Sequence, residues 1–343
     1  MKTIIIIGGG FAGAKCAKDL QNKFNVILID NKNYFEFTPS VLRVLVHPEH
    51  ANKIESLHKN YLKKAEIIIE NVKEIDKEYV YLKNKKIKFD YLIITSGSQY
   101  KLPFKQKNCI MNMRSHNLKK YNSKIKDSKK ILIIGGGVVG VEIASEIVEK
   151  YNNKNITIVQ NNNELMPRNN NKTKENIKTY LEKNNIKLIF NNKIIDSKNN
   201  TYYFNDGKKI NTDLAFYCTG IKPNYDFMKK TFSKYINKNH FVDVNEYLQL
   251  KDHKNIFIGG DIANINEEKL AQNAEKHAEI ICKNIINLEK NKLLKKYKSK
   301  KRIMVISLGE KIGIAEYKKY SLIGKIPAIM KKFIEYKTMK NYK

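Results

Sequence analysis

Short runs of consecutive apolar residues recur along the chain, and two of them end in three glycines. These two runs are residues 4–7, which are all isoleucine, and residues 131–134, which read Ile-Leu-Ile-Ile. An unbroken apolar run of this length predicts a strand buried on both faces, as in a parallel sheet. The stretch after each set of glycines has the mixed apolar and polar pattern of a helix. The sequence therefore predicts a strand–turn–helix unit that occurs twice.

The first turn has the spacing of a dinucleotide-binding fingerprint, with Gly8, Gly10 and Gly13 as G-x-G-x-x-G. The first glycine permits a tight turn, the second lets the backbone approach a pyrophosphate, and the third packs the helix on the strand. The helix N-terminus then offers N–H groups to the phosphates. Asp30 ends the next strand, seventeen residues past Gly13, close to the roughly 20 expected for an acid that binds a ribose. The expected ligands of this unit are Gly8, Gly10, Phe11, Ala12, Gly13 and Asp30.

The same fingerprint returns 127 residues downstream. Two fingerprints in one chain predict two dinucleotides, a tightly held FAD at the first and an exchangeable nicotinamide nucleotide at the second. The ribose-reading residue of the second unit is Gln160, which is neutral and so does not repel the 2′-phosphate of NADPH. The co-substrate is therefore NADH or NADPH, and the choice stays open. The residues expected to bind it are Gly135, Gly137, Val138, Val139, Gly140 and Gln160.

Three further strand-and-turn patterns point to the same ligands. Residues 90–98, with Gly97, and residues 213–224, with Gly220, repeat one pattern, and each is expected to close one nucleotide unit. A third strand ends in two glycines and Asp261, which is expected to bind the ribityl hydroxyls of FAD. The alternative is that Asp261 caps a helix predicted over residues 267–288. That helix would point its N-terminus at the flavin, where Lys269 and Ala271 could contact the ring.

The loop after Asp30, residues 31–43, contains no cysteine; its last residue, Arg43, is among the expected FAD contacts. Flavin disulfide reductases carry their dithiol in this region, so electrons are expected to leave the flavin by another route. No cysteine pair has C-x-x-C spacing, which argues against a disulfide scaffold, a zinc site and a redox-active dithiol. No metal site is predicted. The cysteines are Cys16, Cys109, Cys218 and Cys282.

The remaining stretches predict smaller elements. Residues 64–75 and 79–89 predict an antiparallel meander, residues 121–130 a polar linker, and residues 185–205 two strands. Past residue 297 come two short apolar runs and then a basic amphipathic stretch over residues 320–336. This stretch suits a helix lying on an anionic membrane, and equally an ordinary helix that packs on its own domain.

The chain length and the net charge limit which functions the protein can have. A chain of 343 residues fits two domains, and no apolar run approaches the roughly 18 residues of a membrane span. No secretory signal is visible, so we expect a cytoplasmic protein. A peripheral position on a membrane surface is compatible with this expectation. The net charge of +31 attracts nucleic acid or anionic membranes. Codon usage in an AT-rich genome would also produce it, and the asparagine tracts favour that explanation.

Together these motifs resemble the FAD-dependent pyridine nucleotide oxidoreductases, most closely the apoptosis-inducing-factor-like branch that includes ferroptosis suppressor protein. Type II NADH dehydrogenases are next nearest. The terminal block, Tyr336-Lys-Thr-Met339, looks like the Trp-Lys-Thr-Met ending of that branch, with Tyr for Trp. The likeness covers nearly the whole chain, and its blocks are residues 8–13, 34–39, 135–142, 218–222, 244–249, 259–261 and 336–339.

The resemblance and the two fingerprints imply an α/β fold of the glutathione-reductase-like kind. It has two Rossmann-like dinucleotide-binding domains, the second inserted in the first, and a small C-terminal α+β segment. The expected boundaries are 1–122 and 243–298 for the FAD-binding domain, 123–242 for the NAD(P)H-binding domain, and 299–343 for a C-terminal segment that contacts the acceptor or a membrane.

The resemblance further implies that NAD(P)H is oxidised by bound FAD, with hydride passing to flavin N5 and two electrons then passing to a lipid quinone. Glu142 matches the family's acid near the nicotinamide, and Lys337 its functional C-terminal lysine beside the flavin. Both are expected to be catalytic, and Glu142 also to bind NAD(P)H. Lys337 would stabilise negative charge on the flavin or quinone; a solvated charge on a lysine-rich tail is the alternative.

Two other functions stay open. One is a basic flavoprotein that acts mainly by binding nucleic acid in cell death, through non-specific attraction to phosphates. No nucleic-acid-binding motif is present in the sequence. The other is an NAD(P)H reductase for a non-quinone acceptor, such as a protein carrier. The oligomeric state is not predicted.

Overall fold

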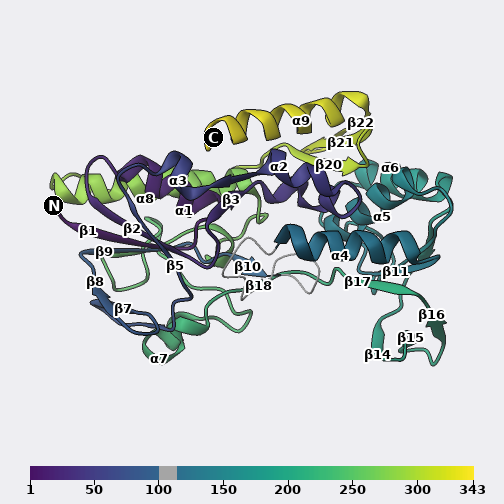
Figure 1. Ribbon diagram of the computed structural model, residues 1–343, viewed down its shortest axis with the longest axis horizontal. Helices are drawn as coiled ribbons and strands as arrows, with labels where there is room; N and C mark the ends of the chain where they lie inside the picture. The colour runs from purple at the N-terminus through teal and green to yellow at the C-terminus, as the bar shows by residue number, and fades with distance from the viewer. Residues whose placement is uncertain (100–113) are drawn as a thin grey trace.

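Two parallel β-sheets form the body of the molecule, and the computed structural model describes residues 1–99 and 114–343 (Figure 1). The strands of the first sheet are β1 (Thr3–Ile7), β2 (Asn25–Asp30), β5 (Glu66–Ile69), β9 (Tyr91–Ile94) and β19 (Ile256–Ile258). The strands of the second sheet are β11 (Lys130–Ile134), β12 (Asn155–Val159), β13 (Lys187–Ile189) and β17 (Leu214–Tyr217). The orders are β19-β9-β1-β2-β5 and β13-β12-β11-β17.

Helices and short elements surround these sheets. The helices are α1 (Phe11–Leu20), α2 (Ala51–Ile54), α3 (His58–Tyr61), α4 (Arg114–Asp127), α5 (Val138–Lys150), α6 (Asn171–Lys183), α7 (Lys229–Phe232), α8 (Ala271–Glu289) and α9 (Lys325–Lys340). The short strands are β3 (Tyr34–Glu36), β4 (Glu55–Leu57), β10 (Ser98–Gln99), β16 (Lys209–Asn211) and β18 (Lys222–Pro223), and the 3-10 helices are η1 (Thr38–Leu45), η2 (Pro48–His50), η3 (Asp226–Met228), η4 (Ser233–Tyr235) and η5 (Gly260–Ile262). Within the described residues, no helix is long and apolar enough to cross a bilayer.

The isoleucine run forms the central strand of the first sheet. In β1, Ile4 and Ile6 belong to the apolar core that includes α1 and α8, whereas Ile5 and Ile7 belong to a separate core on the other face. Ile5 lies opposite Ile27 of β2 and Leu92 of β9. A strand covered on both faces has no solvent-facing positions, which is why its sequence does not alternate.

The stretch of chain that forms the second sheet is inserted between two strands of the first sheet. β9 and β19 are hydrogen-bonded neighbours, although all strands of the second sheet lie between them in the chain. This confirms the predicted fold class, two Rossmann-like units with the second inserted and a small C-terminal α+β segment, whose strands are antiparallel. The residue boundaries of the domains stay a prediction.

Two of the smaller predictions for strands need correction. β5 pairs in parallel with β2, so the antiparallel meander begins only later in the chain. Residues 185–205 contain three strands instead of two, of which β13 extends the second sheet. The strands of these antiparallel units are β6 (Glu74–Ile75), β7 (Tyr79–Tyr81) and β8 (Lys86–Lys88), and β14 (Ile194–Lys198), β15 (Thr201–Phe204) and β16.

The prediction of a polar linker over residues 121–130 is wrong, because α4 occupies most of these residues. Ile125 of this helix is fully buried, and Asn122 Nδ2 donates to the carbonyl oxygen of Leu45 at 2.8 Å. A helix with one narrow buried face leaves little apolar periodicity in the sequence.

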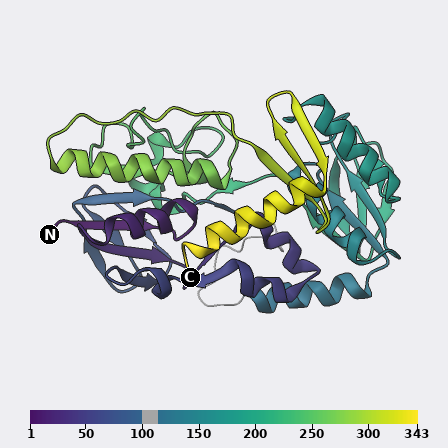
Figure 2. The same cartoon turned by 90° about the horizontal axis from the view of Figure 1, so that it is seen from above.

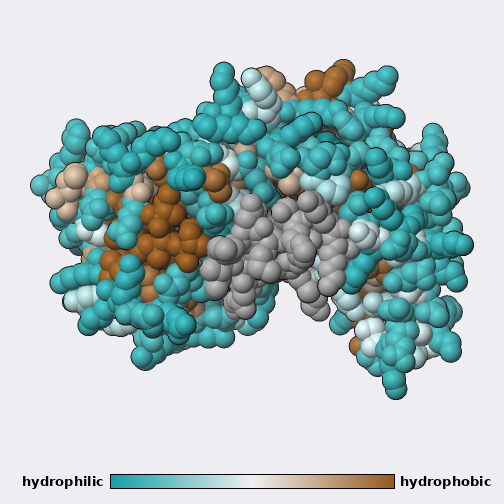
Figure 3. All heavy atoms as spheres, in the orientation of Figure 1, coloured by the Kyte–Doolittle hydropathy of each residue, from teal (hydrophilic) through white to brown (hydrophobic). Residues whose placement is uncertain are grey.

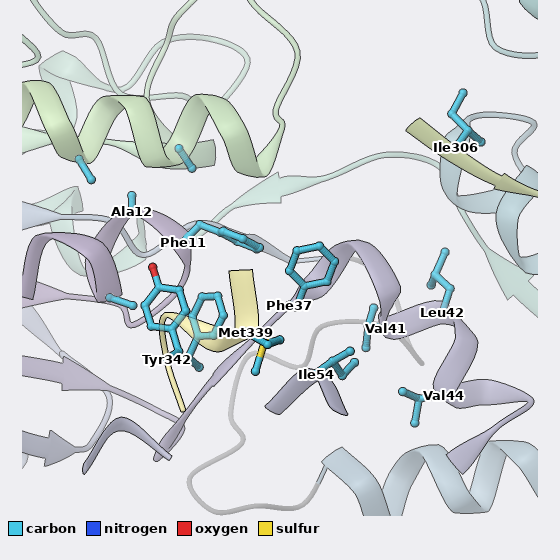
Figure 4. Packing of buried hydrophobic residues seen from close by; sticks show 14 of the residues in the cluster. Phe11, Ala12, Phe37, Val41, Leu42, Val44, Ile54, Ile306, Met339 and Tyr342 are labelled. Carbon is cyan, nitrogen blue, oxygen red and sulfur yellow. The ribbon is translucent and has the colours of Figure 1, made fainter. Parts of the chain in front are cut away.

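The C-terminal segment is an antiparallel sheet followed by α9, which lies across both halves of the molecule (Figure 2). Its strands are β20 (Met304–Leu308), β21 (Ile312–Tyr317) and β22 (Tyr320–Gly324). The prediction of a helix over residues 320–336 therefore starts five residues too early, because residues 320–324 form β22. The chain end is held by packing: the Tyr342 ring stacks on Phe35 with centroids 3.9 Å apart, and Met339 lies near Ile54 (Figure 4).

Candidate active site

One cavity of about 1230 Å³ lies at the carboxyl ends of strands from both parallel sheets. Both glycine turns line it, as do the turns after β9 and β17 and the inner side of α9. Ligands of open α/β sheets bind at this edge. The volume exceeds the roughly 300–1,000 Å³ of ordinary small-molecule sites, so the cavity has room for more than one such ligand.

The first glycine turn has the shape that a pyrophosphate needs. Gly8 has φ +97°, and a Cβ there would lie 2.5 Å from the backbone oxygen of Thr95, the residue after β9. A Cβ on Gly10, the N-cap of α1, would have nothing within 4 Å, so this residue leaves open space toward the cavity. Phe11 and Ala12 line the cavity at the helix N-terminus, whose N–H groups suit an anion. Gly13 is not a lining residue and instead lets α1 approach the Gly8 backbone.

Asp30 lines the cavity at the end of β2. Its Oδ2 accepts the N–H of Gly9 at 3.1 Å and lies 3.2 Å from His58 Nε2. Burial alone would raise the pKa of Asp30, but the His58 hydrogen bond, the Lys32 charge and the Gly9 amide hold it below its ordinary value. Asp30 is therefore ionised at neutral pH, which suits a carboxylate that accepts ribose hydroxyls.

The second glycine turn repeats this geometry. A Cβ on Gly137 would have nothing within 4 Å, and Gly137, Val138 and Val139 line the cavity together with Gly135. Gly140 is not a lining residue, because it packs against the Gly135 backbone as Gly13 packs against Gly8.

Gln160 occupies the position that corresponds to Asp30. Its Oε1 accepts the N–H of Gly136 at 3.0 Å, and its Nε2 donates to the Glu164 carbonyl oxygen at 3.3 Å. The amide thus reproduces the acid's contact with the turn without its charge. Gln160 and Gly220 both line the cavity.

Asp261 lies on the side of the cavity nearest to β10. It belongs to η5, and Ser98 Oγ donates to its Oδ2 at 2.6 Å. The N-cap of α8 is Leu270, so Asp261 does not cap that helix. The helix predicted from residue 267 begins at Ala271.

Three further predicted FAD contacts line the same cavity: Gly97, Lys269 and Ala271. Lys269 Nζ donates to the carbonyl oxygens of Ala263 at 2.6 Å and Ile265 at 3.3 Å. Burial lowers the pKa of Lys269. Its ammonium is held by backbone, which places a fixed cation near Asp261.

Glu142 and Lys331 form a buried ion pair in the cavity wall. Glu142 Oε1 accepts from Lys331 Nζ at 2.6 Å and from the N–H of Ser307 at 2.8 Å. Their exposed fractions are 6% and 9%, and both line the cavity. Lys331 comes from the inner face of α9, which also presents Ile334 and Thr338 to the cavity.

Two predicted site residues lie elsewhere. Lys337 is exposed on α9 and is not a lining residue, although Thr338 is. Arg43 is also absent from the lining: its Nη2 donates to Glu146 Oε1 at 2.9 Å and to the Gly309 carbonyl oxygen at 3.0 Å. Arg43 therefore joins η1 to α5 and to the turn between β20 and β21.

No sulfur pair stands at this site among the described residues, where Cys16, Cys218 and Cys282 are buried and unbridged. Burial raises the pKa of the Cys218 thiol, which keeps it protonated and unreactive. Cys109 lies outside the described residues. The wall near the first unit is mainly apolar and includes Phe37, Val41 and Leu42.

Sequence reasoning missed Lys331 because it is one lysine among many in a basic tail. The available signal was helical spacing: Lys331, Ile334 and Thr338 share one face of α9, and Ile329 and Phe333 lie on the exposed face. The sequence alone does not show which face of α9 is turned toward the cavity, because that depends on how α9 packs.

Known proteins resemble this chain over most of its length. A family described as pyridine nucleotide-disulphide oxidoreductase matches residues 2–278. Apoptosis-inducing factor homolog A of Dictyostelium discoideum is 35% identical, over 92% of this chain and 85% of the relative. Ferroptosis suppressor protein 1 of Homo sapiens is 27% identical, over 91% of this chain and 88% of the relative.

Solved structures share the fold at lower identity. The sulfide:quinone oxidoreductase of Aquifex aeolicus has a TM-score of 0.83 at 19% identity and covers 100% of this chain and 91% of its own. The NDH2 of Plasmodium falciparum in complex with NADH has a TM-score of 0.80 at 17% identity and covers 99% and 98%.

Proposed function

The chain belongs to the pyridine nucleotide-disulphide oxidoreductase family, whose members use FAD and NAD(P)H, and we propose that it passes the electrons of NAD(P)H to a lipid quinone. The observation that carries this proposal is that both glycine turns line the same cavity. Two dinucleotides bound at these turns would point toward one shared space. That arrangement suits transfer of hydride between them by position alone.

The residues of the first unit fit FAD. Gly10 has open space at its Cβ position, and Gly10, Asp30 and Asp261 line the cavity. The N-terminus of α1 would hold the pyrophosphate of FAD, Asp30 would accept from its ribose hydroxyls, and Asp261 from its ribityl hydroxyls. When bound, FAD would supply the two-electron redox chemistry. In the second unit, Gly137 and the N-terminus of α5 would hold the pyrophosphate of NAD(P)H, with Gln160 beside its ribose.

Glu142 and Lys331 would act where the two ligands meet. The Glu142 carboxylate is fixed by two donors and would orient the nicotinamide end of the co-substrate. Lys331 supplies a cation on the cavity wall, where it would stabilise negative charge that develops during reduction. The catalytic role of Lys337 stays a prediction, and its exposed position favours Lys331 for this task.

A diffusible acceptor suits the remaining wall. Of the described cysteines, Cys218 lines the cavity, but it is buried and unbridged, and the side chains of Phe37, Val41 and Leu42 present an apolar surface. A quinone ring and its isoprenoid chain would pack on such a surface. A protein carrier would instead need a polar docking face near the flavin.

The decisive test is a turnover measurement on the purified protein. A flavin absorption spectrum should be present, NADH or NADPH should bleach it without oxygen, and steady turnover should need a short-chain quinone. Absence of flavin would refute the proposal, and bleaching without quinone turnover would remove the acceptor alone. Gly137→Asp is the matched variant: it should keep the flavin and slow bleaching at least roughly tenfold, because its carboxylate would face the co-substrate phosphates.

The outer face of α9 favours contact with an anionic lipid surface, which we include in the proposal. Ile326, Ile329, Phe333 and Tyr336 follow helical spacing, and each is 62–65% exposed. A small group of hydrophobic residues is visible at the upper edge of the molecule, among mostly hydrophilic ones (Figure 3). The flanking exposed lysines are Lys325, Lys332, Lys337 and Lys340. An apolar stripe with flanking cations matches a membrane interface, and a quinone leaving that interface would meet the cavity on the opposite side of α9.

Vesicle sedimentation tests this contact. Vesicles of phosphatidylcholine with about one third phosphatidylserine should bind the protein, and pure phosphatidylcholine should bind it less. The double variant Ile329→Glu and Phe333→Glu should abolish binding, whereas Ile195→Glu, an equally exposed isoleucine on β14, should not. A dimer in size-exclusion chromatography that the double variant dissociates would show that a second copy covers the stripe instead. Salt-sensitive binding of nucleic acid with no vesicle binding would favour the nucleic-acid alternative.

A further inference from the structure

A buried histidine holds the backbone of the turn that carries Asp261. His277 lies in α8, is only 2% exposed, and is not among the residues that line the cavity. The N–H of Gly260 donates to its Nδ1 at 3.0 Å. Gly260 itself lines the cavity and has φ +73°, a conformation that favours glycine.

The direction of this hydrogen bond assigns the protons of the ring. A backbone N–H can only donate, so Nδ1 of His277 carries the lone pair and Nε2 carries the proton. Nε2 lies 2.8 Å from Glu267 Oε1. Tyr297 Oη and Ser299 Oγ each donate to Glu267 Oε2 at 2.6 Å. Glu267 is thus fixed on one side of the ring, and its carboxylate directs Nδ1 toward Gly260 on the other side.

The charge of Glu267 supports this orientation. Burial alone would raise its pKa, but the hydrogen bonds from His277, Ser299 and Tyr297 lower the pKa to about 2. The group is therefore a carboxylate at neutral pH and accepts the Nε2–H of the neutral imidazole.

The N–H of Gly260 belongs to the Gly259–Gly260 peptide, so its hydrogen bond to His277 holds the backbone directly before the Gly260–Asp261 peptide. Ser98 holds the Asp261 side chain from the other side. Little space is left around the turn, since a Cβ on Gly259 would lie 2.9 Å from Ile281 Cδ1 and 3.3 Å from His277 Cβ. The backbone of this turn is therefore held by contacts from α8, and its side chain by a contact from β10.

We propose that His277 is a positioning residue of the flavin site: it accepts the Gly260 N–H and so fixes Asp261 for the ribityl hydroxyls of FAD. The inference rests on the proposed binding of FAD to the first unit. Without an acceptor, the buried N–H would lack a partner, which folded proteins avoid. The Gly259–Gly260 peptide would turn to find one, and Asp261, which follows Gly260, would shift with it. His277 reaches the ligand only through this turn.

Two substitutions separate the roles of the two ring nitrogens. In His277→Asn, the amide oxygen can take the place of Nδ1 and accept from Gly260, while the contact with Glu267 is lost. In His277→Gln, the longer side chain can reach Glu267 but leaves the Gly260 N–H without its acceptor. The two variants carry the same functional group, so their difference reports which contact matters.

The measurement is the dissociation constant of FAD from the reconstituted apoprotein, followed by quenching of flavin fluorescence. His277→Asn should stay within about threefold of the wild type, and His277→Gln should bind roughly tenfold more weakly, as expected for one lost hydrogen bond at a buried group. The visible circular dichroism of the bound flavin should be native-like in His277→Asn and altered in His277→Gln. Thermal unfolding of each apoprotein checks the fold.

Equal weakening in both variants would overturn the proposal, because the packing of the ring would then matter and its Nδ1 would not. Unchanged affinity in both would overturn it as well. If His277→Gln does not fold, Glu267→Leu replaces it: loss of the group that orients the ring should weaken FAD binding severalfold, and wild-type affinity would contradict the proposal. A wild-type protein that binds no FAD would refute the proposed function itself, before any variant is made.

Discussion

Replacement of Gln160 by Glu should give the second unit a preference for NADH. Gln160 is 6% exposed, and its Oε1 accepts the N–H of Gly136 at 3.0 Å. Asp30 makes the same contact with Gly9 at 3.1 Å, so a carboxylate is compatible with this kind of turn. The variant keeps the size of the side chain and the hydrogen bond to the turn, and it adds one negative charge where the adenosine ribose is proposed to lie.

The magnitude follows from that charge. Two unit charges about 4 Å apart repel by about 1 kcal/mol in water and by about 4 kcal/mol at an effective dielectric constant of about 20. The 2′-phosphate of NADPH would meet this repulsion, whereas the 2′-hydroxyl of NADH would gain a hydrogen bond to a carboxylate. The contact of Gln160 Nε2 with Glu164 is lost for both coenzymes and cancels in their ratio. A shift of about 2 kcal/mol corresponds to roughly 30-fold in preference.

The assay is the ratio of kcat/KM for NADPH to that for NADH, with the rate of anaerobic flavin bleaching as a second readout. Asn199→Asp is the matched control, because this exposed turn residue lies outside the cavity lining and its substitution changes the net charge equally. The control should leave the ratio unchanged. A Gln160→Glu protein with an unchanged ratio, or with equal losses for both coenzymes, would refute the assignment of Gln160 to the ribose.

Three other predictions concern stability and reactivity. Lys331→Met breaks a buried pair and should lower the free energy of unfolding by about 3 kcal/mol, whereas Lys332→Met, which removes an exposed ion pair, should cost no more than about 1 kcal/mol. Urea unfolding compares the stabilities of the two variants. Glu142→Gln, combined with Lys331→Met, should recover part of the stability that Lys331→Met loses. Equal losses in Lys331→Met and Lys332→Met would contradict the buried ion pair. The pKa of Glu267 is lowered to about 2, so its stabilising effect is complete above the unfolded pKa of 4.5 and is lost as the pH falls toward about 2. In Glu267→Gln, the melting temperature should therefore depend less on pH in that range. An unchanged dependence would argue against the hydrogen-bond network around Glu267. Burial raises the pKa of Cys218, so mass spectrometry should find it unmodified by maleimide at pH 7 until the protein unfolds, and rapid labelling of the folded protein would contradict its burial.

The fold class could be predicted because its signals are local. A run of four isoleucines, three glycines and an amphipathic stretch form one contiguous strand–turn–helix unit, and its repetition implies two such units. The same reasoning failed for α4, which has a buried Ile125 on an otherwise polar helix and therefore little periodicity. It also failed at β22, because an apolar and lysine-rich stretch is compatible with a strand and with a helix.

The nucleotide contacts of the site were predicted for the same local reason. Of the predicted residues, Gly8, Gly10, Asp30, Gln160 and Asp261 all line the one cavity. Each stands at the carboxyl end of a strand or in the turn after it, where the backbone itself dictates the position. Their roles toward FAD and NAD(P)H stay predictions that the experiments above test.

The sequence by itself determined two dinucleotide units and the residues of their turns, because those features depend on neighbours along the chain. Only the tertiary structure decided that Lys331 and not Lys337 faces the cavity, that Arg43 pairs with Glu146, and that His277 holds Gly260. These contacts join segments 17 to 189 residues apart. They depend on which face of a helix is turned inward, and that choice is made by packing of the whole core, which no single stretch of sequence contains.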